Sequence, residues 1–562
     1  MTSDAGLYAT VDAFLAGLVA GGVRNVVVSP GSRSTPLAVP ARARDDLDVD
    51  VILDERAAGF FALGRAKATR SPVVLVCTSG TAGANYYPAI IEAQLSRVSL
   101  VVLTADRPPE LWGWDAGQTI DQVHLFGRHA QDFVQMPIGE FEPHRAERIG
   151  FRAAVTSSTG PRGPVHVNWP FREPFEPPDE WIETYLPPRS VLRSEGPVDQ
   201  SDHTPVLDQA TKLERGLIVV GPLDAGGDAI AAIGHLAGVT GWPVVADPLS
   251  QLRSHHTPAL VLDAADHVLR SPAASRLAPD VIVRVGATPT SKAFRLWVER
   301  THPAQMILID PDSGWSDPSG ALSTHLQIDV EALGRVRDPG PRRGGWSAEW
   351  DDLNRRARKI VDETIGADPL LELGIAASVA EHVPAGKALM VASSMPVRDL
   401  DMAMPGGGRQ LRIFANRGAN GIDGTIATGA GISAATGQCT ILIGDLALLH
   451  DLGGAFTAGQ QHLDLTIVVM NNGGGGIFSL LPIAAQGERI HFDELFRTPQ
   501  GADFAVLAEL VGASYDLVTD PDSLGVLLSQ PGGLRIIEIP VDPEANVAQL
   551  DSLGEAIRRG LA

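Results

Sequence analysis

Short apolar runs alternate with helix-length segments along most of the chain. Residues 7–20 read as an amphipathic helix that ends at Gly21-Gly22. Apolar strands are then predicted at residues 25–28, 49–53, 72–77 and 99–103, and each is followed by a polar or glycine-rich loop. Helices that alternate with short apolar strands predict a doubly wound parallel sheet. Ligands of such sheets bind at the carboxyl ends of the strands, so function is expected there.

The same pattern occurs twice more. Strands are predicted at residues 217–220, 244–246, 281–285 and 306–309, and the alternation resumes from about residue 351. Proline-rich breaks at 170–205 and 338–346 separate these regions and read as linkers. The sequence therefore predicts an α/β protein of three doubly wound parallel-sheet domains, with boundaries at residues 1–185, 200–340 and 351–562.

One stretch of the third region combines two strand ends with polar residues. An apolar run at 439–443 ends at Gly444-Asp445, and a second at 465–470 ends at Asn471-Asn472 followed by four glycines. Parallel neighbours would bring Asp445 and Asn472 to one edge, although they lie 27 positions apart. Their oxygens suit Mg²⁺, and the glycines would let backbone N–H groups approach a diphosphate. Taken singly, Asp445 reads equally as a helix cap and the Asn/Gly cluster as a plain loop.

Composition narrows the class of protein. The 562 residues are 44% apolar and 20% charged, as in ordinary soluble domains. A formal net charge of −22 argues against nucleic acid as the main partner but leaves anionic substrates open. Cys77 and Cys439 lie in apolar runs and read as core residues of a protein from a reducing compartment. The N-terminus lacks a basic signal region and residues 425–444 read as helix, turn and strand, so we expect a cytoplasmic protein without a membrane span.

Cationic residues gather in loops beside predicted strand ends or helix starts: Ser32-Arg33, Arg107, Lys292, Arg398 and Arg417. Each alone reads as a surface cation, but together they predict a substrate with several carboxylates. Glu55 follows a predicted strand and, taken alone, reads as a carboxylate at a helix start.

The spacing of Gly444-Asp445 and Asn471-Asn472 resembles the diphosphate-binding motif of thiamine-diphosphate enzymes, although Leu446 stands where most members have glycine. Seven segments resemble one family within them, the 2-succinyl-5-enolpyruvyl-6-hydroxy-3-cyclohexene-1-carboxylate (SEPHCHC) synthases of menaquinone biosynthesis: SPGSRSTPL (29–37), ILDERAAGFFALG (52–64), TSGTA (78–82), TADRPPEL (104–111), NRGANGIDG (416–424), GDLALLHDL (444–452) and NNGGGGIFSLLP (471–482). Gly117 departs from the family, where some relatives carry a polar side chain before Gln118.

The resemblance implies an activity. It implies a transferase that uses thiamine diphosphate with Mg²⁺ or Mn²⁺ to decarboxylate 2-oxoglutarate. The succinyl carbanion equivalent then undergoes 1,4-addition to isochorismate, CO₂ is released, and pyruvate is not released. Because the cofactor is held by two distant segments, it also implies a homodimer or a dimer of dimers (a homotetramer) with active sites at the interface.

The resemblance also implies site residues. The residues implied to act in catalysis are Glu55, as activator of the pyrimidine, with Ile422, Arg398, Arg417 and Gln118. Those implied to bind the cofactor are Glu55, Gly80, Ser394, Ile422, Gly444, Asp445, Leu446, Asn472, Gly474 and Ile477, of which Asp445, Asn472 and Gly474 bind the metal. Those implied to bind substrate are Ser32, Arg33, Arg107, Gln118, Lys292, Ser394, Arg398, Arg417, Phe478 and Leu481.

Two other functions compete with this interpretation. Another thiamine-diphosphate decarboxylase or carboligase, acting on pyruvate or oxalyl-CoA, would share the diphosphate motif but not need the cationic loops. A nucleotide- or flavin-binding electron carrier could use the segment RGLIVVGPLDAGG (215–227). That segment lacks the GxGxxG pattern of dinucleotide sites, which disfavours this alternative.

Overall fold

A computed structural model describes residues 5–139, 141–178, 204–224, 226–312, 314–340, 345–530 and 532–562. The chain forms two compact units, which are described separately. Unit 1 contains residues 1–194, 416–439 and 448–465, and unit 2 contains residues 195–415, 440–447 and 466–562. Most of the linker expected at 170–205 lies outside the described residues.

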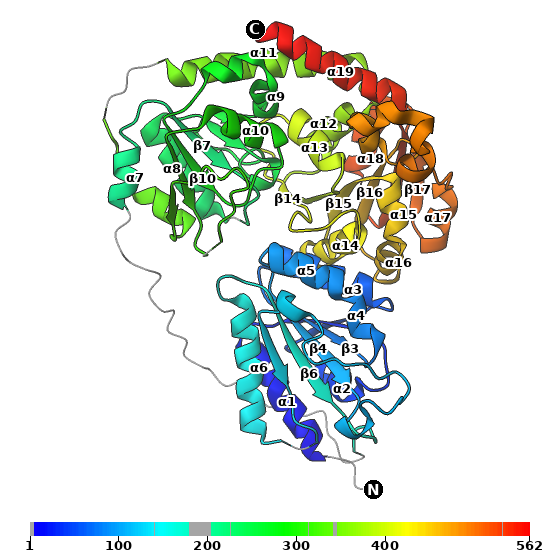
Figure 1. The fold of residues 1–562 in the computed structure, drawn as a ribbon. Coiled ribbons are helices and arrows are strands. Elements are labelled where there is room, and N and C mark those ends of the chain that lie inside the picture. Colours follow the sequence, from blue (N-terminus) through cyan, green and yellow to red (C-terminus); the bar gives the residue numbers. More distant parts are fainter. Residues whose placement is uncertain are drawn as a thin grey trace. The chain divides into compact units, whose positions relative to one another are not determined.

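The first sheet belongs to unit 1 and has the strand order β2-β1-β3-β4-β6-β5, with every pair of neighbours parallel (Figure 1). Its central strands are Val-rich and buried on both faces, as in sheets covered by helices on either side. The strands are β1 (Asn25–Val28), β2 (Asp48–Val51), β3 (Val73–Cys77), β4 (Leu100–Asp106), β5 (Asp132–Gln135) and β6 (Pro164–Pro170). The helices are α1 (Ala5–Ala20), α2 (Thr35–Ala43), α3 (Glu55–Thr69), α4 (Thr81–Asn85), α5 (Tyr87–Leu95) and α6 (Pro143–Ser158).

Two later helices, α14 (Thr425–Thr436) and α16 (Leu452–Gln460), also belong to unit 1. Glycines allow α14 to pack closely on α3: a Cβ on Gly64 would lie 2.0 Å from the Thr428 carbonyl oxygen, and one on Gly431 would lie 2.0 Å from the Phe61 oxygen. Such distances exclude any side chain at either position, so the two backbones can meet only because both residues are glycine.

The second sheet has the order β12-β11-β10-β7-β8-β9 and lies in unit 2. Its strands are β7 (Gly216–Val220), β8 (Val244–Ala246), β9 (Val261–Leu262), β10 (Val281–Val285), β11 (Gln305–Ile309) and β12 (Thr324–Leu326). Its helices are α7 (Thr204–Ala210), α8 (Gly227–Thr240), α9 (Ala265–Arg270) and α10 (Lys292–Thr301), followed by α11 (Trp346–Ala367). α10 begins at Ser291, whose side chain accepts the backbone N–H of Phe294 as an N-cap.

The third sheet has the order β14-β13-β15-β16-β18-β17, so the strands that precede Asp445 and Asn472 are neighbours. The strands are β13 (Ala388–Val391), β14 (Arg412–Phe414), β15 (Cys439–Gly444), β16 (Leu465–Asn471), β17 (Ser514–Leu517) and β18 (Leu534–Pro540). The helices are α12 (Glu372–His382), α13 (Pro396–Ala403), α15 (Asp445–His450), α17 (Phe504–Val511), α18 (Pro521–Ser529) and α19 (Pro543–Gly560).

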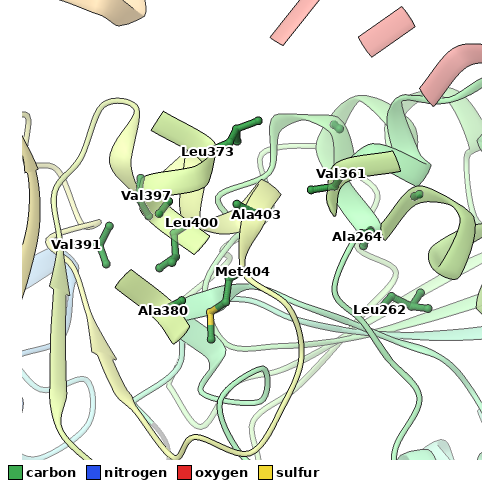
Figure 2. Close-up of a cluster of buried hydrophobic side chains, with 14 of the residues drawn as sticks. Leu262, Ala264, Val361, Leu373, Ala380, Val391, Val397, Leu400, Ala403 and Met404 are labelled. Carbon is green, nitrogen blue, oxygen red and sulfur yellow. The ribbon is translucent and has the colours of Figure 1, made fainter. Parts of the chain in front are cut away.

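One of the two hydrophobic clusters of unit 2 joins the second and third sheets, and the other packs around the second sheet alone. Figure 2 shows Leu262 and Ala264, from the second sheet region, in the same buried cluster as Val391 of β13 and Leu400 of α13. Val361 of α11 contributes to this cluster as well. The second sheet and most of the third are therefore held together by apolar packing within unit 2.

Several sequence predictions are confirmed. Three parallel six-stranded sheets with flanking helices are present, and residues 425–444 form a helix, a turn and a strand. Cys77 and Cys439 are buried and are not joined in a disulfide. In the described ranges, no helix is both long and apolar enough to cross a membrane. The helix predicted at 7–20 is confirmed as α1 (Ala5–Ala20), but it is mostly buried rather than amphipathic, because α6 also packs against it.

Candidate active site

Three adjacent strands of the first sheet, β1, β3 and β4, deliver polar loops at their carboxyl ends. After β4, the Arg107 guanidinium donates from Nη1 to Ser79 Oγ at 2.7 Å and from Nη2 to the Gly117 carbonyl at 3.0 Å. Gln118 Nε2 donates to the Ser79 carbonyl at 3.1 Å. The loops after β3 and β4 thus hold Arg107 and Gln118 on the same serine.

Arg33 belongs to the same edge. Its guanidinium is buried, donates to the Phe171 carbonyl at 2.6 Å, and lies 4.6 Å from the centre of the Phe175 ring. Burial lowers the pKa of Arg33, and the positive charge of Arg107 lowers it further. The carboxylates of Glu173, 3.7 Å away, and Asp106 partly offset this repulsion between the two guanidinium groups, and an anionic ligand would relieve it further. The neighbouring Ser32 is exposed.

Glu55 is the first residue of α3, and the Asp54 side chain caps that helix by accepting the N–H groups of Arg56 and Ala57. Glu55 is half-buried, and its charge contributes to raising the pKa of both Cys77 and Tyr86, whose largest cause is burial. Glu55 thus lies at a helix start, as the simpler interpretation had it, and also close to the buried end of β3. Gly80 follows β3 on the same edge and donates its N–H to Gln122 Oε1 at 2.9 Å.

The loop between β14 and α14 carries Arg417 and Ile422, both half-buried. It ends at Gly424, which has a φ of 65° and lies against the ring of Phe60 in α3. This loop is in unit 1, the same compact unit as Glu55. The structure therefore groups eight of the predicted site residues in unit 1: Ser32, Arg33, Glu55, Gly80, Arg107, Gln118, Arg417 and Ile422.

The strand ends of the third sheet bring Asp445 to the glycine loop. The side chain of Asp445 is buried, and the backbone N–H groups of Leu446 and Gly474 lie near enough to affect its pKa. Burial raises the pKa of Asp445 to about 6, these two N–H groups and that of Asp445 itself oppose the rise, and the nearby charge of Glu372 adds to it. An uncompensated negative charge in this position favours a bound cation. Gly444 precedes Asp445 at the end of β15.

Asn472 is oriented by a residue that the sequence did not single out. Its Nδ2 donates to Oε1 of Glu372, a buried residue at the start of α12, at 2.7 Å. Asn472 Oδ1 is buried and lacks a hydrogen-bond partner within the described parts of the chain. Buried polar atoms are almost always satisfied, so this amide oxygen is available to a ligand.

These residues fit a metal and a diphosphate. Asp445 and Asn472 Oδ1 are hard oxygen donors, which Mg²⁺ and Mn²⁺ prefer. Gly474 has a φ of 143°, and a Cβ there would lie 2.3 Å from the Arg497 carbonyl oxygen. Only glycine therefore fits at this position. Among the residues the structure describes, no group of three or more His, Cys, Asp or Glu forms a metal site of its own.

The remaining predicted residues of unit 2 lie in three places. Ser394 has a φ of 72° just before α13, and its carbonyl accepts Arg398 Nη1. Phe478 packs edge-on against Phe496 with ring centres 5.7 Å apart. Ile477 and Phe478 belong to a 3₁₀ turn (Gly476–Leu480) beside Leu481, which is 45% exposed. Lys292 is exposed at the start of α10.

Two buried carboxylates, Glu372 in unit 2 and Glu92 in unit 1, were not among the residues predicted from the sequence. Glu372 carries no local signal, because its partner Asn472 is 100 positions away. Glu92 could have been found from the sequence. It is the one charged residue of the mostly apolar helix YPAIIEAQL (87–95), where an unpartnered charge would be costly.

Three family models together match most of the chain. Residues 9–125 match the N-terminal domain of thiamine pyrophosphate enzymes that binds the cofactor, residues 180–391 match the middle domain, and residues 407–530 match the C-terminal cofactor-binding domain. Full-length relatives narrow the family. The chain is 42% identical to the SEPHCHC synthase of Geobacillus kaustophilus, with 98% of each chain covered.

The synthase of Myxococcus xanthus is 41% identical over 97% of each chain, and that of Chloroflexus aurantiacus is 39% identical over 98% of this chain and 96% of its own. The chain belongs to the SEPHCHC synthase family. The resemblance read from the seven motifs is thereby confirmed. Membership also makes the chain a thiamine-diphosphate enzyme, and it rules out the electron carrier.

Proposed function

We propose that this enzyme decarboxylates 2-oxoglutarate and adds the remaining succinyl unit to isochorismate by 1,4-addition. The product is SEPHCHC, CO₂ is released and pyruvate is not, and the step belongs to menaquinone biosynthesis. The observation that carries this proposal is the 39–42% identity, over nearly the full length, to enzymes named for that product.

Thiamine diphosphate, when bound, supplies an acidic carbon and an electron sink for the charge that decarboxylation leaves. Asp445, Asn472 and the Gly474 carbonyl would hold Mg²⁺ or Mn²⁺ against its diphosphate, with Gly444, Leu446, Ser394 and Ile477 beside it. The orphaned Asn472 Oδ1 and the uncompensated Asp445 charge support this assignment.

Residues of unit 1 would bind the pyrimidine end of the cofactor. Glu55 would share a proton with the pyrimidine ring nitrogen, a task that a half-buried carboxyl near other buried groups is suited to. Ile422 would hold the cofactor bent, with Gly80 lining its other side. Because these residues and the metal ligands belong to different units of the chain, we place the complete site at the interface of a homodimer or dimer of dimers in the cytoplasm.

Charge balance agrees with two dicarboxylic substrates. Arg33 and Arg107 repel each other beside Gln118 and Ser32, and isochorismate would bring carboxylates to them. Arg398, with Ser394, Lys292 and Arg417, would bind the distal carboxylate of 2-oxoglutarate or the assembled product. Phe478 and Leu481 would form the apolar wall that excludes water from the reacting carbon.

The test is an assay of purified enzyme with thiamine diphosphate and Mg²⁺. We expect CO₂ release from 2-oxoglutarate to be slow alone and to become multiple-turnover with isochorismate, with SEPHCHC identified by mass spectrometry. Pyruvate and oxalyl-CoA serve as competing substrates. Faster turnover of either one, without product from isochorismate, would replace this proposal with a different decarboxylase or carboligase.

A further inference from the structure

A buried carboxylate in unit 1 accepts hydrogen bonds from the loop that carries Arg417 and Ile422. Glu92 is fully buried in α5, and four hydrogen bonds end on its two oxygens. Oε1 accepts Gly418 N–H at 3.0 Å and the Ser96 hydroxyl at 2.6 Å. Oε2 accepts Ala419 N–H at 2.7 Å and Asn420 N–H at 3.1 Å. Three consecutive backbone N–H groups of one loop therefore converge on a single side chain.

A lysine extends this network to both ends of the loop. Lys67 Nζ, from α3, lies 3.6 Å from Glu92 Oε1 and donates to Asn416 Oδ1 at 2.8 Å. Asn416 Nδ2 then donates to the Thr428 hydroxyl, in the first turn of α14, at 2.9 Å. The segment from Asn416 to Thr428 is thus bound to α3 and α5 within one compact unit (Figure 1).

Gly418 makes the close approach possible. A Cβ there would lie 2.9 Å from Glu92 Oε2 and 2.8 Å from Ser96 Oγ. Burial by itself would raise the pKa of Glu92, but Lys67, Ser96 and the loop N–H groups outweigh burial and lower it. The side chain is therefore a carboxylate at neutral pH, with its charge fully compensated.

The loop bound in this way has no regular secondary structure of its own between Phe414 and Thr425, yet it carries Arg417 and Ile422. We infer that Glu92, together with Lys67, is a positioning residue that fixes this loop so that Arg417 and Ile422 are in place before substrate binds. This inference rests on the proposed function, which gives those two residues their tasks. It explains why one charge interrupts an apolar helix and why the loop reads NRGANG.

If Glu92 only stabilised the fold, its loss would have a different effect on the kinetics. An enzyme that is merely destabilised loses active molecules, which lowers the apparent kcat and leaves KM unchanged. A displaced Arg417 weakens its hold on a carboxylate, which raises KM. Misplacement of a binding group by about 1 Å can lower rates by about 100-fold, so a tenfold to hundredfold fall in kcat/KM is expected.

The test variant is Glu92→Gln, because its amide nitrogen would face the loop N–H donors and at most one oxygen could still accept. Asp317→Asn is the matched control. Asp317 accepts the N–H groups of Ser319 at 3.1 Å and Leu322 at 2.7 Å and pairs with buried Arg284 at 3.6 Å, which reproduces the same design in the second sheet region. Both variants are compared with wild type by hydrogen–deuterium exchange and by steady-state kinetics with 2-oxoglutarate and isochorismate.

We expect Glu92→Gln to speed exchange in peptides covering 416–424 by roughly tenfold or more and to raise KM for one of the dicarboxylates. Asp317→Asn should speed exchange only at 317–322 and keep the wild-type KM values. Unchanged exchange at 416–424, or faster exchange with unchanged KM, would overturn the inference. Wild type without SEPHCHC activity would instead refute the proposed function, while the exchange data would still test the contact. If Glu92→Gln is insoluble, Gly418→Ala disturbs the same contact and is held to the same outcomes.

Discussion

Asn472 and Glu372 form a part-buried pair in which the amide donates to the carboxylate at 2.7 Å, while the Asn472 oxygen has no hydrogen-bond partner among the described residues. The neighbouring residue repeats the pattern: Asn471 Nδ2 donates to Glu538 at 2.7 Å. In that second pair, however, the Asn471 oxygen accepts the Gly473 N–H at 3.1 Å. Of these two adjacent asparagines, only Asn472 keeps an oxygen for a ligand.

The first prediction concerns the metal site. Asp445→Ala should abolish tight binding of the metal and with it the diphosphate, because the diphosphate charge would lose its main counter-ion. After dialysis against a chelator and reconstitution with thiamine diphosphate and Mg²⁺, the cofactor content of variant and wild type is compared. Equal retention in both would remove Asp445 from the metal site.

The pair of Asn472 and Glu372 allows a matched experiment. Glu372→Ala should free the Asn472 amide to rotate and weaken Mn²⁺ binding, measured by electron paramagnetic resonance of free Mn²⁺, by about 10–100-fold, as for other residues that orient metal ligands. Glu538→Ala removes the equivalent partner of Asn471 and should leave Mn²⁺ affinity within about twofold of wild type. Equal losses in both variants would mean that the loop, not the ligand orientation, is affected.

Glu55→Gln tests the activating carboxyl. The amide keeps the size and polarity of the side chain, so the variant should fold and bind the cofactor. It cannot share a proton as a carboxyl does, so exchange of the cofactor C2 proton for deuterium should slow by ~10²–10⁴-fold. Quenched-flow measurement of that exchange checks the prediction directly, and a wild-type rate would exclude Glu55 from proton transfer.

The buried strands of the second sheet were predictable from their apolar runs. The apolar runs at 217–220, 244–246, 281–285 and 306–309 correspond to β7, β8, β10 and β11 within one residue. By contrast, β5, β9 and β12 were missed because they are short edge strands, which need no continuous apolar run. β6 was missed for another reason: His166 and Asn168 interrupt its apolar pattern and are satisfied internally by Thr104 and Asp106.

The residues of the candidate site, too, were predictable only where a local sequence pattern marks them. The meeting of Asp445 with the glycine loop followed from strand ends alone, and in the structure the Gly474 N–H lies near enough to Asp445 to lower its pKa. Residues that act through tertiary contacts could not be found in this way. Glu372 and Glu92 each reach partners from sequence positions 100 or more residues away, and no local periodicity encodes such a meeting.

Stability should fall in mild acid through His166. Burial lowers its pKa from 6.5 to about 3, with a smaller contribution from His124. The unfolded chain therefore binds a proton below pH 6.5 that the folded chain does not, and stability is lost as pH falls from 6.5 toward 3. The loss approaches about 1.4 kcal/mol per pH unit for this one group. Urea unfolding of wild type and His166→Gln at about pH 6.5, 5.5 and 4.5 measures how steeply the free energy of unfolding of each protein changes with pH. A slope in the variant as steep as that of wild type would mean that another group takes up the proton.

The last prediction divides the arginines between the two substrates. Arg107 is held with Gln118 on Ser79 in unit 1, whereas Arg398 lies in α13 of unit 2, so the two are positioned by separate parts of the chain. Removing one charge-assisted hydrogen bond typically costs ~1.5–3 kcal/mol, or about tenfold to over a hundredfold in kcat/KM. Arg107→Ala should raise KM for isochorismate by that factor and leave the first reaction with 2-oxoglutarate nearly normal. Arg398→Ala should slow that first reaction itself. Stopped-flow spectroscopy with 2-oxoglutarate alone, set against the steady-state KM of each substrate, separates the two effects. Equal impairment of both stages by both variants would show that the carboxylate sites overlap, and the division would then be wrong.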